Sequence, residues 1–150
     1  MPVQTILCLI AGRVKRLPPG DTVSPVGLPT QASVIVLIGL QATALTTTST
    51  TDALIPGTDF LWQSAYVPSG RSVFLEIVGN GSAATVAASV ALYTAAGVLV
   101  AGAAVTAAGT AITRGRSTAL TLVDNTTYQL RFKTTVAGTA SIKSVRIIII

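Results

Sequence analysis

Short apolar runs separated by turn-forming residues recur along the chain from residue 33 onward. In the segment 126–136, large apolar residues alternate with polar and charged ones, which is the pattern of a strand with one buried and one exposed face. The residues expected to face inward are Tyr128, Leu130 and Phe132, and those expected to face outward are Gln129, Arg131 and Lys133. The segment 34–38 is instead continuously apolar and mostly β-branched, which favours a strand buried on both faces.

The remaining apolar runs predict a succession of further strands. They are expected over residues 59–67, 71–79, 84–94, 98–106, 117–123 and 141–150, whereas residues 41–58 hold either a strand or a polar loop. Turns are expected at Pro68–Gly70, Asn80–Gly81, Ala95–Gly97, Asp124–Asn125 and Ala137–Gly138. Asn-Gly is the strongest two-residue hairpin signal. Short strands in this number, without a convincing helix, predict an all-β fold, an antiparallel jelly-roll-like β-sandwich.

The first 31 residues differ from the rest of the chain. Four of the seven prolines fall within residues 18–29, and proline fixes φ and lacks a backbone donor. We therefore expect residues 1–31 to form an extended, Pro-rich N-terminal arm that runs over a surface. Residues 32–150 are expected to form the sandwich domain.

The chain ends with one arginine and four isoleucines: Arg146, Ile147, Ile148, Ile149 and Ile150. On a strand, the isoleucines place two large apolar groups on each face, so both faces require burial. Two interpretations remain open. The strand is central and well covered within the monomer, or neighbouring subunits cover it, because an exposed apolar edge would aggregate.

The amino-acid composition excludes the most common catalytic mechanisms. Half of the residues are hydrophobic and 10% are charged, whereas about 25% of the residues are charged in a typical domain. So many hydrophobic residues and so few charged ones exclude a disordered chain and a coiled coil. Histidine is absent and Cys8 is the single cysteine. These counts exclude Ser-His-Asp and Cys-His catalysis, the usual zinc sites and an intrachain disulfide, and Cys8 is expected to be a small buried residue. We expect no enzymatic activity, no cofactor and no small-molecule substrate.

The net charge of +5 comes from ten Lys and Arg against five Asp and Glu. The positive residues are dispersed, many of them two positions apart, as Arg13/Lys15/Arg16, Arg71, Arg114/Arg116, Arg131/Lys133 and Lys143/Arg146. Side chains two positions apart on a strand share a face. Scattered pairs without a recurring aromatic platform disfavour specific nucleic-acid binding.

A long uncharged stretch raises the alternative of a membrane span. Residues 77–113 carry no formal charge and are long enough to cross a bilayer as a helix. Glycines interrupt this stretch, and residues 89–100 match a strand, a tight turn and a second strand. A small membrane protein is therefore kept only as a further alternative. The basic group at 13–16 follows the apolar N-terminal run, which is the wrong order for a secretory signal.

Two sets of residues are candidates for chemistry. Asp52 and Asp59 lie near one expected loop and could bind calcium with Thr and backbone oxygens, although turn and strand-entry roles are favoured. Phe60, Trp62 and Tyr66 would share one face of the expected strand 59–67. Such a row can stack on sugar rings, but in a chain with one Trp, three Tyr and three Phe a role as core anchors is favoured.

Two stretches of the sequence resemble a known family. The segment 17–23, Leu-Pro-Pro-Gly-Asp-Thr-Val, is similar to a Leu-Pro-x-Gly-Asp-Thr-Leu/Val phrase of tailed-bacteriophage virion proteins. From Trp62 onward, the segments 66–70, 90–93, 128–132 and 145–148 resemble jelly-roll domains of such proteins, so the likeness covers about two thirds of the chain. The resemblance implies a non-enzymatic virion component of the capsid decoration, or cement, type.

Cement proteins of this kind sit on the head lattice and clamp neighbouring major capsid proteins. The resemblance therefore implies a structural protein on the capsid surface, made in the host cytoplasm. Its expected partners are the major capsid protein and copies of itself in a homo-oligomer. The interface candidates are Arg13, Lys15, Arg16, Leu17, Pro18, Pro19, Arg146, Ile147, Ile148, Ile149 and Ile150, with basic residues facing an acidic capsid surface.

The main alternative is a tail- or head-fibre adhesin module that binds host glycan through Phe60, Trp62 and Tyr66. A solvent-facing Trp62 would favour it. An enzyme comes last, because the catalytic residue types are missing.

Overall fold

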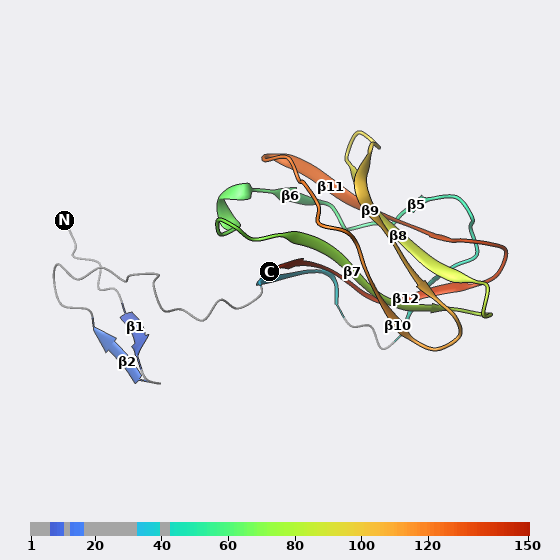
Figure 1. Ribbon diagram of the computed structural model, residues 1–150, viewed down its shortest axis with the longest axis horizontal. Coiled ribbons are helices and arrows are strands. Elements are labelled where there is room, and N and C mark those ends of the chain that lie inside the picture. Colours follow the sequence, from blue (N-terminus) through green and yellow to red (C-terminus); the bar gives the residue numbers. More distant parts are fainter. Residues whose placement is uncertain (1–6, 11–12, 17–32, 40–42) are drawn as a thin grey trace. The chain divides into compact units, whose positions relative to one another are not determined.

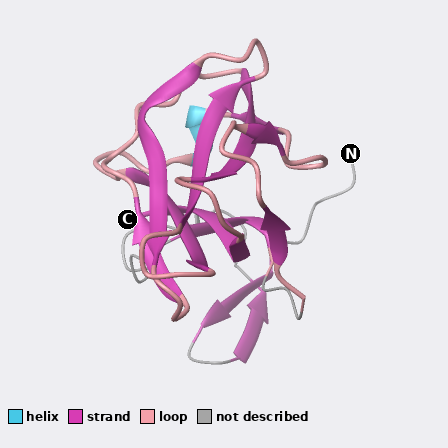
Figure 2. Ribbon diagram, turned by 90° about the vertical axis from the view of Figure 1, so that its right-hand side faces the viewer, coloured by secondary structure: helices cyan, strands magenta, loops and turns pink. Residues whose placement is uncertain are grey.

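Two antiparallel sheets pack face to face in the larger part of the chain (Figures 1 and 2). The computed structural model describes residues 7–10, 13–16, 33–39 and 43–150. Residues 1–31 and 32–150 form separate units, and each is described by itself. The predicted all-β antiparallel sandwich is confirmed.

The first sheet contains β10 (Thr113–Arg116), β7 (Val73–Gly81), β12 (Ala140–Ile149) and β3 (Ser33–Ile38), in that order. The short strand β4 (Leu45–Thr47) also pairs with β12, beyond the end of β3. All of these pairings are antiparallel. Because β3 and β4 pair with different parts of one edge of β12, they fill a single strand position.

The second sheet contains β5 (Ala53–Leu54), β11 (Thr126–Thr134), β8 (Ala87–Thr94) and β9 (Leu99–Ala108), in that order. The strand β6 (Phe60–Trp62) pairs with β11 as well, and a short 3-10 turn (Ser64–Tyr66) follows it. β5 and β6 again share one strand position along the edge of β11. Each sheet therefore has four strand positions.

The strands before and after the turn that follows β8 pair with one another in a nested order, like the two arms of one long hairpin. From that turn outward, β8 pairs with β9, β7 with β10, β5 and β6 with β11, and β3 and β4 with β12. Rolling this long hairpin brings β7 against β12 and β8 against β11. Eight strand positions connected in this way form a jelly roll.

The core lies between the two sheets and follows the alternation of each strand. Leu75, Ile77, Leu92, Leu130 and Ile147 have no exposed surface. The hydroxyl of the buried Tyr128 accepts a hydrogen bond from the N–H of Val123 at 2.8 Å, so its polar atom is satisfied. The inward set predicted for β11 is confirmed.

The strand predicted at 34–38 exists, but its expected burial on both faces is wrong. β3 is the last strand of the described sheet, and Val34, Ile35 and Val36 are exposed. A continuous apolar run does not reveal how many neighbours a strand has, and here β12 is the one described neighbour of β3.

The strand predicted at 59–67 is shorter than expected, since β6 ends at Trp62 and the 3-10 turn follows. Asn80–Gly81 does not form the predicted hairpin either. These two residues lie inside β7, opposite Ser141 and Ala140 of β12, and the next strand belongs to the other sheet. Glycine is required at Gly81, because a Cβ there would meet the backbone carbonyl group of Val86.

The predicted turn at Ala95–Gly97 is confirmed, with Gly97 at φ +85° between β8 and β9. The strand predicted at 117–123 is wrong, because a single isolated bridge joins Leu120 to Val73 there. The strand in this region is β10 instead. The predicted strand at 141–150 corresponds to β12.

The N-terminal unit contains an antiparallel hairpin of β1 (Leu7–Ile10) and β2 (Arg13–Arg16). Regular strands were not expected here, because prolines at 18–29 interrupt regular elements. The Pro-rich segment 18–29 lies outside the described residues. The predicted arm and its boundary at residue 31 therefore remain predictions.

The uncharged stretch 77–113 contributes β8, β9 and parts of β7 and β10. Among the described residues, no helix has the length and apolar character needed to cross a membrane. The expectation of strand, tight turn and strand over 89–100 is correct.

Two isoleucines near the C-terminus offer a matched test of this fold. Ile147 has no exposed surface, whereas Ile150 is 38% exposed. We expect Ile147→Ala to lower the free energy of unfolding by about 2–5 kcal/mol, because it leaves a cavity in the core. The change Ile150→Ala should cost about 0.5–1 kcal/mol. Urea unfolding followed by circular dichroism measures both, and equal losses would contradict the central position of β12.

Candidate functional site

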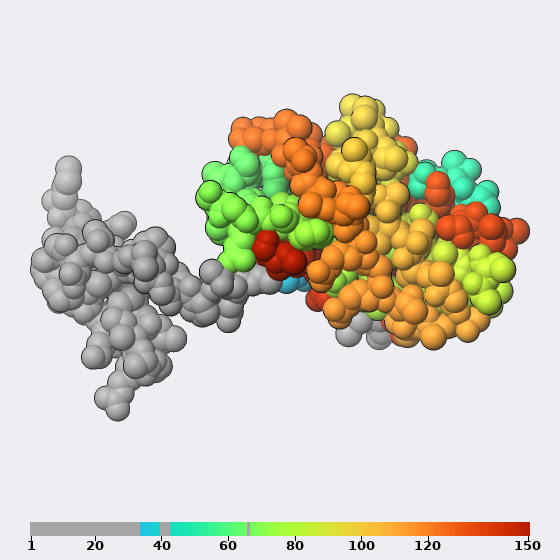
Figure 3. Space-filling model, viewed as in Figure 1, coloured from blue at the N-terminus to red at the C-terminus, as the bar shows by residue number. Residues whose placement is uncertain are grey.

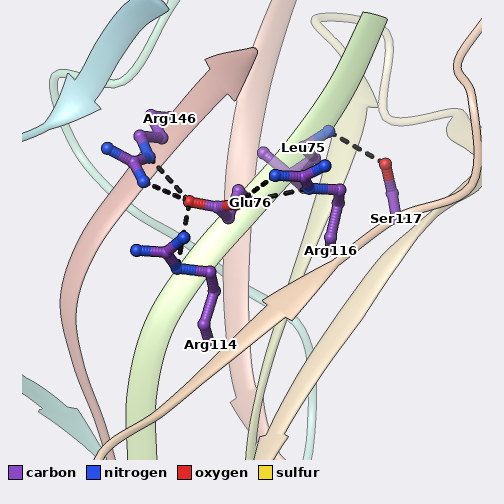
Figure 4. Close-up of polar contacts among 6 residues, drawn as sticks. All are labelled: Leu75, Glu76, Arg114, Arg116, Ser117 and Arg146. Atoms are coloured by element: carbon purple, nitrogen blue, oxygen red, sulfur yellow. Dashed lines mark hydrogen bonds and ion pairs between the residues drawn. The ribbon is translucent and has the colours of Figure 1, made fainter.

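Glu76 lies at the centre of the outward-facing side of the first sheet. In the strand register, Arg116 of β10 stands opposite Glu76 on one side and Arg146 of β12 on the other. Arg114 is two positions before Arg116, so it shares the same face. Three arginines from two strands therefore converge on one carboxylate of the strand between them (Figure 4).

The arginines bind the carboxylate in different ways. Arg146 donates from Nε to Oε1 at 2.8 Å and also from Nη2 to the same oxygen. Arg116 donates from Nη2 and Nε to Oε2, at 3.0 and 3.3 Å. The Nε of Arg114 lies 3.5 Å from Oε1 and forms an ion pair. Both oxygens of Glu76 are thus fully used.

The backbone on either side of this cluster is held in place as well. The N–H of Leu75 donates to the hydroxyl of Ser117 at 2.9 Å (Figure 4), and the N–H of Ser117 donates to the carbonyl of Leu75 at 2.8 Å. These bonds extend the pairing of β10 beyond Arg116. They fix the register that brings Arg114 and Arg116 to Glu76.

The Glu76 side chain is fully covered although it points away from the core. The side chains of Arg114, Arg116 and Arg146 are 62%, 43% and 32% exposed, so the guanidinium groups form the surface above it. Burial acts to raise the pKa of Glu76, but the hydrogen bonds from Arg146 and Arg116 and the charges of Arg146 and Arg114 outweigh it and lower the pKa. Three positive charges and one negative charge leave the cluster at +2.

This arrangement is suited to binding rather than to acid–base catalysis. A carboxylate with a lowered pKa and all its acceptor positions occupied neither donates nor accepts a proton readily near neutral pH. It holds the guanidinium groups in position. The surplus positive charge then faces outward, where it attracts anionic groups.

A hollow of about 350 Å³ lies beside the cluster on the same face. Its described lining consists of Val36, Ile38, Val78, Arg114, Ser144 and Arg146. Two of the three arginines therefore border a space whose other walls are mostly apolar. Val36, at its edge on β3, is 60% exposed.

The next row of outward-facing residues is apolar. In the register, Phe74 of β7 stands opposite Ile148 of β12, and Ile148 stands opposite Val34 of β3. The guanidinium of Arg116 lies 5.7 Å from the centre of the Phe74 ring, a geometry that favours a cation–π contact. We call this outward side of β10, β7, β12 and β3 the basic–apolar face.

A second polar cluster lies on the other sheet. Asp52 Oδ2 accepts hydrogen bonds from the Tyr93 hydroxyl at 3.0 Å and from Lys133 Nζ at 2.9 Å. The guanidinium of Arg131 stacks 4.4 Å from the centre of the Tyr93 ring. Arg131 and Lys133 share a face of β11, as their spacing predicts.

Two pKa values in this cluster are shifted. Burial, followed by the hydrogen bond to Asp52, raises the pKa of Tyr93. The hydrogen bond to Asp52 also raises the pKa of Lys133. Both shifts keep the protons on the donors near neutral pH, so the cluster is a stabilising ion pair with a tyrosine rather than a reactive group.

A larger hollow, of about 390 Å³, lies where the two edge strands are interrupted. Residues 37–39, 43–45 and 55–58 line its described part. These residues supply apolar groups, backbone and threonine hydroxyls but no titratable side chain. This lining offers no group for acid–base chemistry.

The structure disperses the C-terminal interface candidates over two faces. Ile147 and Ile149 point into the core, Ile148 is buried on the basic–apolar face, and Arg146 belongs to the Glu76 cluster. Ile150 exchanges two backbone hydrogen bonds with Ser72, at 2.7 and 3.0 Å. The end of the chain reaches the surface there (dark red in Figure 3).

The N-terminal interface candidates belong to the other unit. Arg13, Lys15 and Arg16 lie in β2, whereas Leu17, Pro18 and Pro19 lie outside the described residues. Cys8 lies in β1, opposite Lys15. An interface role for these residues remains a prediction.

The aromatic candidates do not form an exposed row. Trp62 is 4% exposed and belongs to the core, and Phe60 packs partly buried against it. The Phe60 ring lies 5.9 Å from that of Tyr128. Tyr66 lies in the 3-10 turn, and its side chain is not described. The glycan-binding alternative thus lacks the exposed Trp62 that would favour it.

The structure separates the two acidic candidates in role. Asp52 forms the ion pair above, whereas Asp59 is exposed before β6. Asp124 Oδ1 accepts the N–H of Ser64 at 2.6 Å, and this hydrogen bond lowers the pKa of Asp124. In the described part of the chain, no group of three or more His, Cys, Asp or Glu is placed to hold a metal.

Of the four residues in this cluster, Arg146 was predicted as an interface candidate, whereas Glu76, Arg114 and Arg116 were not predicted as a site. The available signal was a lone glutamate inside an apolar strand, together with two arginines two positions apart. A charge at such a position requires partners. The pattern does not say which arginines supply them, because Arg116 and Arg146 are 40 and 70 residues away.

No protein-family model and no curated protein matches this chain. Among solved structures, it is similar to infectious bursal disease virus of the Gt strain, with 14% identity, a TM-score of 0.49 and coverage of 100% of this chain and 40% of that chain. The structure of the Gx strain is 13% identical with a TM-score of 0.46, and the match covers 99% of this chain and 38% of that chain. The structure of T=1 particles derived from infectious bursal virus is 16% identical with a TM-score of 0.47, and the match covers 100% of this chain and 39% of that chain.

The chain thus spans about two fifths of the length of the chains it matches. At these identities and scores, the likeness carries no argument about function. We therefore derive the function from this chain's own residues.

The role of Glu76 predicts a pH dependence of stability. Because hydrogen bonds and charges of the arginines hold the folded-state pKa of Glu76 below its ordinary value, the contribution of Glu76 to stability is complete above the unfolded pKa and is lost as the pH falls through the folded pKa. We expect Glu76→Gln to cost about 1–3 kcal/mol at pH 7 and to reduce the loss of stability on acidification. Urea unfolding at several pH values measures this, and an unchanged acid dependence would contradict the assignment.

The Asp52 cluster predicts a shift at Tyr93. Replacing the carboxylate by Asp52→Asn should lower the pKa of Tyr93, because it removes the negative charge while Lys133 and Arg131 remain. Titration of ¹³C-labelled tyrosine by NMR, with the Tyr93 signal assigned from Tyr93→Phe, measures the change. The exposed Asp59→Asn serves as a control and should leave that signal unchanged. An unshifted Tyr93 in Asp52→Asn would show that the hydrogen bond is absent.

Proposed function

We propose that the chain is a structural virion protein that binds and stabilises the assembled head lattice of a tailed bacteriophage, as a capsid decoration protein. The basic–apolar face carries this proposal. On one side of the sheet it combines exposed Val34 and Val36 with the guanidinium groups of Arg114, Arg116 and Arg146. Exposed apolar groups next to fixed charges are characteristic of protein interaction surfaces.

The fold is compatible with this function but does not select it. Jelly rolls occur in viral capsid domains, lectin domains and cupins, and a fold by itself does not determine a function. The lectin option requires an exposed stacking surface, whereas Trp62 is buried in this chain. The resemblance of the segment 17–23 to virion proteins supports the capsid option.

The mechanism is stabilisation by selective binding. A protein that binds the assembled lattice but not free subunits shifts the equilibrium toward the lattice. Many copies on a symmetric shell add weak contacts, so a modest affinity per site is sufficient. In this proposal the partners are the major capsid protein and further copies of the chain, and the protein resides on the capsid surface after synthesis in the host cytoplasm.

Sedimentation with particles tests the proposal. The protein is mixed with expanded, DNA-free capsids of the virus that encodes it, and in parallel with immobilised host glycans. We expect saturable binding to the capsids and none to the glycans. Binding to glycans without binding to capsids would overturn the proposal and support an adhesin.

Two valines provide a matched pair of variants for the same assay. Val36 on the basic–apolar face is 60% exposed, and Val98 in the turn after β8 is 62% exposed, so the fold should tolerate a glutamate at either position. We expect Val36→Glu to weaken capsid binding at least about tenfold, since it removes an apolar contact and places a negative charge beside the arginines. Val98→Glu should bind as the wild type does. Equal effects of the two changes would exclude the basic–apolar face as the binding surface.

A further inference from the structure

We propose that the hollow bordered by Arg114 and Arg146 binds an acidic side chain of a partner protein, a glutamate or aspartate flanked by apolar residues. This inference deepens the proposed function, on which the identity of the partner as a capsid subunit rests. The site itself follows from charge, free donors and the lining of the hollow.

The first argument is the imbalance of charge. Three guanidinium groups surround one carboxylate, which leaves +2 in a small area of the surface. Among the described acids elsewhere, Asp52 pairs with Lys133, Asp124 binds the N–H of Ser64, and Asp59 lies before β6 of the other sheet. A second anion at the cluster would reduce the repulsion among the arginines.

The second argument is the supply of hydrogen-bond donors. Arg116 and Arg146 use their Nε and Nη2 atoms for Glu76, which leaves Nη1 of each outside that contact. No hydrogen bond to another described residue engages the side chain of Arg114. A guanidinium carries five N–H donors in a fixed plane and matches a carboxylate in two-point contact. Arg114, 62% exposed, is therefore the principal candidate to bind the incoming anion.

The third argument is the apolar lining. Val36, Ile38 and Val78 form the walls beside the two arginines, and Ser144 adds a hydroxyl. A carboxylate that enters this hollow brings its neighbouring side chains against those walls. An acidic residue between apolar residues satisfies both parts of the surface, whereas an isolated small anion satisfies the charge alone.

The lining also distinguishes a protein partner from nucleic acid. Binding of a single strand combines a positive groove with exposed aromatic rings on which bases stack. Phe74, the aromatic residue on this face, lies beneath the guanidinium of Arg116. The geometry thus favours an acidic peptide segment over an RNA or DNA strand.

NMR titration of the full chain tests the site directly. The probe is the capped tripeptide acetyl-Leu-Glu-Leu-amide, and its neutral counterpart contains Gln in place of Glu. We expect saturable shifts of the Nε–H signals of Arg114 and Arg146 with the Glu peptide, and at least about fivefold weaker binding of the Gln peptide. Equal binding of the two peptides, or no saturable shift at millimolar peptide, would overturn the proposal.

Variants of single arginines separate the site from general positive charge. Arg114→Gln should weaken binding of the Glu peptide at least about fivefold and leave the Glu76 contacts to Arg116 and Arg146 intact. Arg71→Gln removes the same charge from the segment before β7 and should have little effect. Equal losses in the two variants would mean that net charge alone attracts the peptide, and this would contradict a defined site.

One further result would assign the hollow to another occupant and overturn the proposal. Displacement of the peptide by a lower concentration of a uridine hexanucleotide would indicate a nucleic-acid site. Peptide binding at Arg114 without sedimentation with capsids would support the site while rejecting the capsid assignment, so the two proposals fail separately.

Discussion

The rest of the structure depends on one constraint: the strands before the β8–β9 turn pair with the strands after it in reverse sequence order. It places β12, the end of the chain, between β7 and the β3–β4 edge, so that both sides of β12 are hydrogen-bonded. Ile147 and Ile149 are then buried by the opposite sheet. The same register sets Arg146 beside Glu76, and the pairing of β10 with β7 brings Arg116 to its other side. One topology thus creates both the core and the charged cluster.

The Glu76 cluster gives the outer face of the first sheet a fixed positive charge. Glu76 fixes the positions of flexible arginines that would otherwise lose entropy on meeting a partner. It neutralises one of their three charges, and the remaining charge lies beside exposed Val36 and the hollow. The Asp52 cluster on the other sheet is less positive, because Asp52 offsets one of the two charges of Lys133 and Arg131 and leaves +1. The two outer faces of the sandwich therefore differ in charge balance, and the face around Glu76 is the one suited to an acidic partner.

Local patterns were sufficient to predict some elements and insufficient for others. The alternation in 126–136 shows which residues of β11 face inward, and Gly97 marks the turn between β8 and β9, because both features depend on adjacent residues. Asn80–Gly81 misleads, because a connection between sheets follows it and β12 continues the pairing. The exposure of Val36 and the partners of Glu76 depend on strands distant in sequence. The fold class was therefore predictable from the sequence, whereas Arg146 was the one residue of the Glu76 cluster that the sequence offered as an interface candidate.

The central claim is that the basic–apolar face is the surface through which the protein acts, and hydrogen–deuterium exchange tests it most directly. Exchange is compared between the free protein and the protein bound to capsids of its virus. The account predicts slower exchange on binding in the peptides that contain residues 33–38 and 113–116, with unchanged exchange in the turn 95–98. Protection confined to other parts of the sandwich, with 33–38 and 113–116 unchanged, would contradict it.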